Sequence, residues 1–218
     1  FVKINPESGN MNVEFQILTP PFDYDLSHAG KGPSHDWFFF SCYNTEEAFT
    51  LLEVNASQKD KDFIMAVNWK KAEQYLKEGK AKDQVSEFYH NVYDEGKHSA
   101  TSEILKTVKM LDPKDCPGMI YYIPCPKSPH GADVDPSGEY IVGGGKLATV
   151  IPVFSFSKMI KAIEDKQFDG DVAGIPVIKY EAALHGEVQK PGLGPLHTEF
   201  DDKGFAYTSM FVSSEVVK

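Results

Sequence analysis

Two stretches of the chain decide its fold: HGADVDPSGEYIVGGGKL at residues 130–147 and HTEFDDKGFAYTSMFVSSEVV at residues 197–217. Both contain, in the same order, a histidine, a short extended segment, a turn with Asp that closes on Gly, and an aromatic strand. A weaker copy without the leading histidine is GPSHDWFFFSCYNTEE at residues 32–47. A strand–turn–strand unit that recurs at intervals of tens of residues is typical of the blades of a β-propeller.

Short strand-like segments surround these units along most of the chain. They are rich in β-branched and aromatic residues and are separated by Pro, Gly, Asp and Ser turns, which predicts an all-β protein. The predicted strands cover residues 2–5, 13–18, 37–43, 63–67, 119–124, 139–145, 148–156, 205–212 and 215–218.

A helical pattern interrupts the strands at about residues 69–111. WKKAEQYLKEG at 69–79 has apolar residues three and four apart and ends on a glycine, and SEFYHNVY and SEILKTVKML continue the pattern. A second, shorter amphipathic segment is FSKMIKAIEDKQF at 156–168. We therefore expect residues 1–218 to form one domain, part of a β-propeller with a helical insertion.

Composition excludes several classes of function. The 218 residues carry a net charge of -10, and all 22 basic residues are lysine, so the basic, arginine-bearing face of a nucleic-acid-binding protein is missing. The apolar share of 41% and mean hydropathy of -0.34 are those of a globular domain, and no apolar run approaches the roughly 20 residues of a membrane span.

The ends and the cysteines say little about the cellular compartment. The chain opens on Phe1 rather than Met, directly in a strand-like segment, and closes within an apolar–polar alternation, so we expect a fragment. Cys42, Cys116 and Cys125 have neither CxxC nor zinc spacing. Cys116 and Cys125 could form one disulfide in an exported protein, or all three could be buried thiols.

Two of the seven histidines stand apart because each begins a repeat. Equivalent positions of successive blades lie around the axis of a propeller, so His130 and His197 are expected to converge at one end of the central channel. Imidazole binds copper, zinc, iron and nickel, so the pair does not select a metal, and a purely structural role stays open. The other histidines are expected to be at the surface or satisfied in the core: His28, His35, His90, His98 and His185.

Two other motifs give weaker indications of a binding site. GGGK at residues 143–146 lacks the spacing of a phosphate-binding loop, and its glycines are expected to allow a close backbone approach or a bulge. The acidic residues Glu46, Glu47, Asp60 and Asp62 form either a solvated edge or a calcium site without EF-hand spacing.

Longer segments resemble nitrous oxide reductase. They are CPKSPHGADVDPSGEYIVGGGKLATVIPVFSF at residues 125–156, LGPLHTEFDDKGFAYTSMFVSSEVVK at 193–218, FFFSCYNTEEA at 38–48 and KDKDFIMAVNW at 59–69. The resemblance covers nearly the whole chain and is weakest at 70–118. The residues of the matching segments are closer to those of the atypical branch of the family.

The resemblance implies that the chain is about three to four blades of a seven-bladed propeller, with His130 and His197 as two of the histidine ligands of a copper–sulfide cluster on its axis. The remaining ligands, and a C-terminal cupredoxin domain with a binuclear copper site, would lie outside this chain. The resemblance also implies a calcium site at Tyr43, Glu46, Asp62 and Ser128, where the better-known branch has Asn in place of Ser128, together with a backbone carbonyl within Asn55 to Lys59.

The implied reaction is the two-electron reduction of nitrous oxide to dinitrogen and water by a periplasmic homodimer, an oxidoreductase of denitrification. A small cytochrome c or cupredoxin would donate the electrons, and the fragment alone would be inactive. Each ligand imidazole needs an acceptor on its other nitrogen. The candidates near in sequence are Asp133 and Asp135 for His130, and Glu199 and Asp201 for His197. The alternatives are a non-enzymatic propeller module that binds a protein or small ligand, and a lactonase-type hydrolase.

Overall fold

The structure is a computed structural model that describes residues 1–43, 62–85 and 107–218. The chain divides into two compact units. Unit 1 contains Phe1–Thr19 and Lys71–Cys116, and unit 2 contains Pro20–Lys70 and Pro117–Lys218. Among the described residues, no helix has the length and apolarity needed to cross a bilayer.

Unit 1 is built from short strands and most of one helix. Strands β1 (Val2–Ile4) and β2 (Met11–Val13) form an antiparallel pair, and β3 (Gln16–Ile17), β8 (Thr107–Leu111) and β7 (Lys82–Val85) form a second small sheet in that order. Helix α2 (Trp69–Lys77) has its first two residues in unit 2 and the others in unit 1.

The helix expected over the first part of residues 69–111 is confirmed by α2, but the last part is a strand. Residues of β8 alternate between exposed and less exposed until the buried Leu111, and β8 pairs with β3 and β7. In this segment the pairing with two neighbouring strands overrides the helical spacing of the apolar residues. SEFYHNVY, at residues 86–93, lies outside the described residues.

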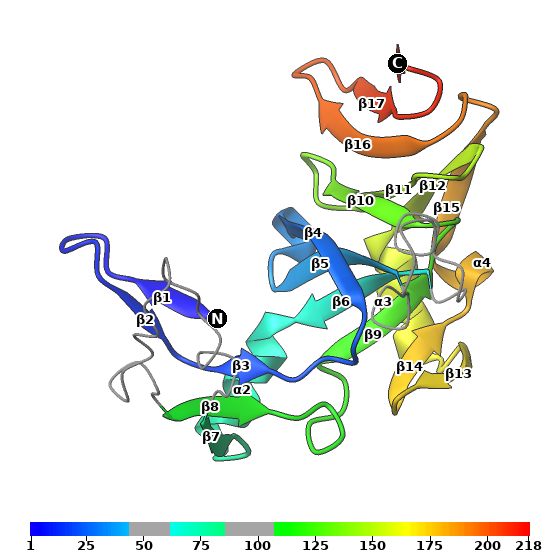
Figure 1. Ribbon diagram of the computed structural model, residues 1–218. Helices are drawn as coiled ribbons and strands as arrows, with labels where there is room; N and C mark the ends of the chain where they lie inside the picture. Colours follow the sequence, from blue (N-terminus) through cyan, green and yellow to red (C-terminus); the bar gives the residue numbers. More distant parts are fainter. Residues whose placement is uncertain (44–61, 86–106) are drawn as a thin grey trace, which may run out of the picture. The chain divides into compact units, whose positions relative to one another are not determined.

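Unit 2 contains three sheets within the described residues (Figure 1). The first sheet has the order β13 (Phe168–Val172), β14 (Ile175–Ile178), β9 (Ile120–Pro124), β6 (Phe63–Asn68), β5 (Trp37–Tyr43), β4 (Asp23–Ala29). The second sheet has the order β10 (Pro129–Val134), β11 (Tyr140–Gly145), β12 (Val150–Ser155), β15 (Leu184–Gln189), and the third has β16 (Pro195–Phe200), β17 (Ala206–Met210), β18 (Glu215–Val217). The short helices are η1 (Gly32–Ser34), α3 (Phe156–Glu164) and α4 (Tyr180–Ala183). The predicted all-β class is confirmed.

The three sheets pack face to face, as the blades of a propeller do. Side chains of the first sheet, the second sheet and α3 share one core, which includes Phe39, Ile64, Ile141, Phe154 and Met159. A smaller core joins the second and third sheets through Val142, Ile151 and Met210. Because successive residues of a strand point to opposite faces, Ile141 and its neighbour Val142 serve the two different cores.

The expected repeat of the turns is confirmed. In the second sheet, the Asp135 carboxylate accepts hydrogen bonds from the N–H groups of Ser137 and Tyr140, and Gly138 closes the turn with φ 77°. In the third sheet, Asp201 does the same for Lys203 and Phe205, and Gly204 closes with φ 83°. The Phe205 N–H in particular lowers the pKa of Asp201. An Asp side chain that accepts backbone hydrogen bonds and a residue that tolerates positive φ are therefore what each turn requires.

The second and third sheets meet through glycines. A Cβ on Gly144 would lie 2.0 Å from the Leu196 carbonyl oxygen, and so would a Cβ on Gly131. On the opposite face of β11, a Cβ on Gly143 would lie 2.9 Å from the Cys125 sulfur. The close approach predicted for the glycine run is thus confirmed.

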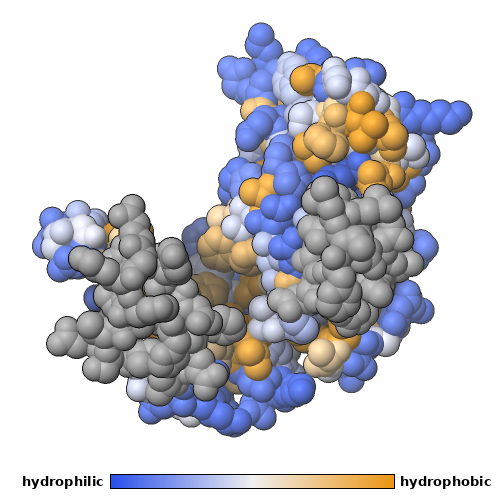
Figure 2. All heavy atoms as spheres, viewed as in Figure 1, coloured by the Kyte–Doolittle hydropathy of each residue, from blue (hydrophilic) through white to orange (hydrophobic). Residues whose placement is uncertain are grey.

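Large apolar side chains of the third sheet and its turns stay exposed. They include Phe205, Phe211, Val212 and Val216, and apolar atoms gather over this part of the face shown in Figure 2.

Cys42, Cys116 and Cys125 are free and buried, and burial raises the pKa of each thiol.

Because no side chain fits between Gly144 and Leu196, we expect Gly144→Ala to destabilise the full-length protein that contains this chain by about 1–3 kcal/mol, the usual cost of overpacking. Gly186→Ala in the same sheet is the matched control, because a Cβ there meets nothing within 4 Å. Denaturant unfolding of both variants is the measurement, and equal stability of the two would contradict this account of the sheet contact.

Candidate functional site

Each sheet of unit 2 has an edge strand with a break in its register, and the three breaks bring polar side chains together. The edge strands β4, β10 and β16 shift register between Tyr24 and Ser27, between Pro129 and Gly131, and between Pro195 and Thr198. Asp25, His130 and His197 lie inside these breaks. A break of this kind re-aims the side chain beside it, which is why irregular strands are frequent at functional sites.

Serine hydroxyls satisfy backbone groups that the breaks leave out of the ladder. The Ser41 hydroxyl donates to the His130 carbonyl oxygen at 3.0 Å and accepts from the Leu26 N–H at 3.3 Å. The Ser209 hydroxyl lies 3.5 Å from the His197 carbonyl oxygen and accepts from the His197 N–H at 3.4 Å. Each candidate ligand is therefore held by the neighbouring strand of the same sheet or of the sheet beside it.

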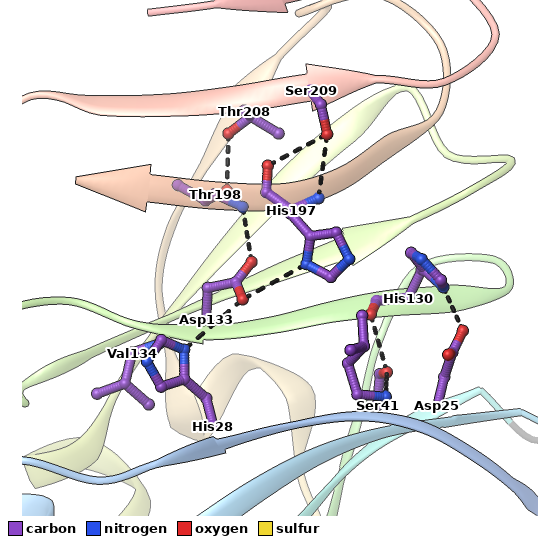
Figure 3. Close-up of polar contacts among 11 residues, drawn as sticks. Asp25, His28, Ser41, His130, Asp133, Val134, His197, Thr198, Thr208 and Ser209 are labelled. Atoms are coloured by element: carbon purple, nitrogen blue, oxygen red, sulfur yellow. Dashed lines mark hydrogen bonds and ion pairs between the residues drawn. The ribbon is translucent and has the colours of Figure 1, made fainter.

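His130 and His197 converge, as the repeat predicted. Their ring centroids are 4.9 Å apart, with the ring planes inclined by 58° (Figure 3). The two side chains are only partly exposed, at 25% and 38%. Two imidazoles from separate sheets thus share one partly enclosed space.

A carboxylate lies on the Nδ1 side of each ring. His130 Nδ1 contacts an Asp25 carboxylate oxygen, and His197 Nδ1 lies 3.7 Å from an Asp133 carboxylate oxygen. Within the described residues, neither Nε2 has a hydrogen-bond partner. A carboxylate at Nδ1 favours the tautomer with its proton on that nitrogen, which leaves the lone pair of Nε2 available to a metal.

Asp133 connects all three edge strands. It lies on β10, one of its oxygens accepts a 2.7 Å hydrogen bond from the Thr198 N–H of β16, and the other is 3.7 Å from both His197 Nδ1 and His28 Nδ1 (Figure 3). Its side chain is 14% exposed, so this hydrogen bond is largely shielded from water.

His28, which the sequence analysis expects at the surface or satisfied in the core, lies beside this group on β4. Its Nδ1 accepts a 3.1 Å hydrogen bond from the Val134 N–H, so its proton is on Nε2. The ring is therefore satisfied by backbone, as the sequence suggested, but it also flanks the Asp133 carboxylate.

Two of the expected carboxylate partners serve other purposes. Asp135 and Asp201 hold the turns described above, and Glu199 is exposed on β16. Asp133, proposed for His130, instead lies beside His197, and Asp25 was missed altogether. Asp25 is more than a hundred residues from His130 along the chain, and no local signal identifies it.

The predicted calcium ligands are partly described. Tyr43 and Ser128 are buried, and the Asp62 side chain is 10% exposed, 3.8 Å from the Lys127 ammonium. The Tyr43 hydroxyl accepts a 3.0 Å hydrogen bond from Lys146. Burial, with Asp23 and Asp25 nearby, raises the pKa of Tyr43. Glu46 lies outside the described residues.

The two other described histidines, His35 and His185, stay apart from this group. His35 is exposed beside Asp36, and His185 packs edge-on against Tyr140. His90 and His98 fall outside the described residues. No cluster of three or more His, Cys, Asp or Glu side chains with metal-binding geometry occurs in the described part of the chain.

Comparisons with known proteins give one consistent result over almost the full chain. It is 28% identical to the nitrous-oxide reductase of Pseudomonas fluorescens over 212 residues, covering 97% of this chain and 28% of that protein. It is 26% identical to the enzyme of that name from Stutzerimonas stutzeri, with the same two coverages, and 31% identical to that of Ralstonia nicotianae over 81% of this chain and 23% of the relative. The chain thus spans well under a third of the length of these relatives.

Two other comparisons add nothing to this. No protein-family model matches the chain. Among solved structures, Kuenenia stuttgartiensis hydrazine synthase aligns with 89% of this chain and 44% of its own, at 12% identity and a TM-score of 0.43, which is too low to support any argument.

The contact between Asp133 and Thr198 predicts how the site responds to substitution. Asp133→Ala leaves the buried Thr198 N–H without its acceptor, so we expect a loss of about 1–3 kcal/mol in the unfolding free energy of the full-length protein. Asp133→Asn keeps an acceptor oxygen and should lose less. Asp169→Ala, at an exposed position of β13, is the control. If Asp133→Ala has the same unfolding free energy as the control, the hydrogen bond from Thr198 to Asp133 does not hold the edge strands together.

Proposed function

We propose that this chain, which is similar to nitrous-oxide reductases along nearly its whole length, is part of an enzyme that reduces nitrous oxide to dinitrogen and water. The observation that carries the proposal is the pair of converging imidazoles, His130 and His197, each with a carboxylate at Nδ1 and an unpartnered Nε2 within the described residues.

The residues fit copper as the metal. Imidazole nitrogen is a good ligand for copper, and neutral imidazoles bind it without adding negative charge. His130 and His197 come from different sheets, so further ligands from other blades can complete the set around the same space. When bound, a copper–sulfide cluster would supply the electrons and the Lewis acidity that a linear, apolar and weakly binding substrate needs.

The residues of this chain orient the ligands. Asp25 fixes the ring of His130, and Asp133 lies at the same nitrogen of His197. The Thr198 N–H holds Asp133 in place at 2.7 Å, so its charge points at the His197 ring rather than at solvent. Such outer carboxylates select the tautomer and raise the basicity of a metal-binding imidazole.

The rest of the proposal concerns the whole protein. We infer that other segments contribute the remaining histidines and a cupredoxin domain with a binuclear copper site. We also infer a periplasmic homodimer that receives electrons from a small cytochrome c or cupredoxin. Because the chain carries only two of the expected ligands, it would be inactive alone. The calcium site at Tyr43, Glu46, Asp62 and Ser128 stays a prediction.

The alternative is a non-enzymatic propeller module in which both histidines are structural. Such histidines would use both ring nitrogens within the fold, as a buried polar side chain normally does. Among the residues that the structure describes, neither Nε2 has a partner, and this, with the partial exposure of both rings, favours the reductase.

The test is the copper and acid-labile sulfide content of the full-length protein, matured without oxygen. We expect His130→Ala and His197→Ala each to lose most of the cluster copper, because a neutral methyl group cannot replace an imidazole ligand. His185→Ala, an exposed histidine of β15, should keep it. Full cluster copper in both ligand variants would assign the two histidines to structure and favour the binding module.

A further inference from the structure

Side chains of two neighbouring edge strands each accept a backbone hydrogen bond from the next sheet. β10 and β16 are the first strands of their sheets, so one side of each has no strand partner among the described residues. His28 of β4 accepts the Val134 N–H of β10 at 3.1 Å. Asp133 of β10 in turn accepts the Thr198 N–H of β16 at 2.7 Å. Two hydrogen bonds of the same kind thus run from sheet to sheet.

The two acceptors occupy the same place in their strands. His28 comes three residues after Asp25, and Asp133 comes three residues after His130. Asp25 and His130 lie inside the register breaks of β4 and β10. Each of these two edge strands therefore supplies one acceptor to the next, first an imidazole and then a carboxylate. The function proposed above uses the carboxylate and gives the imidazole no role.

The hydrogen bond to His28 acts on Asp133 through the backbone. The Val134 N–H belongs to the peptide group that joins Asp133 to Val134, so its bond to His28 restrains the backbone from which the Asp133 side chain extends. The next N–H, that of Asp135, points the opposite way and donates to the Tyr140 carbonyl oxygen of β11. The strand around Asp133 is thus held on one side by its own sheet and on the other by His28.

The proton position on His28 decides which imidazole can bind the Asp133 side chain. One Asp133 oxygen lies 3.7 Å from both His28 Nδ1 and His197 Nδ1, beyond hydrogen-bond distance of either (Figure 3). His28 Nδ1 accepts the Val134 N–H, so it has no proton to donate to this oxygen. His197 Nδ1 has no backbone donor among the described residues, so it can carry a proton and donate it.

We propose that His28 is a positioning residue for the candidate copper ligand His197, and that it acts through Asp133. By accepting the Val134 N–H, His28 fixes the Asp133 backbone and withholds a competing donor, which leaves the Asp133 oxygen to His197 Nδ1. This inference rests on the proposed function, because it concerns the orientation of a ligand of the proposed cluster. Losing an outer partner of a ligand imidazole costs about 10–100-fold in metal affinity or activity.

The experiment compares His28→Phe with His28→Asn in the full-length protein matured without oxygen. Phe keeps a ring and has no acceptor, whereas the side-chain oxygen of Asn can accept the Val134 N–H. We expect cluster copper to pass to an added copper chelator about tenfold faster in His28→Phe than in the unaltered protein, with a shifted visible absorption of the cluster. His28→Asn should restore both. His35→Phe is the control, because His35 also lies beside a carboxylate, that of Asp36, but at an exposed position.

A purely structural His28 would lower the unfolding free energy of His28→Phe and leave copper transfer and the cluster absorption unchanged. That result, or the same copper loss in His28→Asn as in His28→Phe, would overturn the proposal. A double variant gives a second test. Added to Asp133→Asn, His28→Phe should change copper transfer little further, because it acts through that carboxylate, and full additivity of the two effects would contradict this.

The proposed function and this inference fail in different ways. If the unaltered protein holds no cluster copper, the proposed function fails and the inference with it, whereas a normal cluster in His28→Phe overturns the inference alone. If His28→Phe does not fold, a crystal structure of the copper-loaded unaltered protein decides. We expect the Asp133 oxygen within hydrogen-bond distance of His197 Nδ1 while His28 keeps the Val134 N–H. An oxygen that binds His28, or stays out of reach of His197, would refute the inference.

Discussion

The geometry of the site depends on one close contact between backbones. The Leu196 carbonyl of β16 lies against the Cα atoms of Gly131 and Gly144, so the second and third sheets approach more closely than any side chain would allow. Leu196 is the residue next to His197, and Gly131 is next to His130. The same contact that packs the two sheets therefore sets the separation of the two imidazoles.

Around this contact, breaks in the register of the edge strands position the polar side chains of the site. Regular pairing would place alternate residues of β10 and β16 on opposite faces, with no means of aiming one side chain along the edge. The breaks at His130 and His197 release these residues from the ladder, and Ser41 and Ser209 bind the backbone groups involved. Asp25 lies in a third break, on β4, so a register break in the edge strand positions a polar side chain in each of the three sheets.

Charge completes the arrangement. Two carboxylates and two imidazoles lie close together in a partly exposed group, and a third imidazole, His28, accepts a hydrogen bond from the Val134 N–H. Asp25 contacts His130, and its negative charge also contributes to the raised pKa of Tyr43.

By itself the sequence determined the all-β class, the two turn repeats and the convergence of His130 and His197, because strand alternation, Asp–Gly turns and repeat spacing are local signals. It also indicated that the glycine run allows a close approach. It did not reveal β8, since two neighbouring strands outweigh a helical spacing of apolar residues there. Nor did it reveal Asp25 beside His130, Asp133 beside His197 and His28, or Lys146 on Tyr43. Those contacts join residues about 65 to 105 positions apart, and only the packing of separate sheets decides which polar side chains meet.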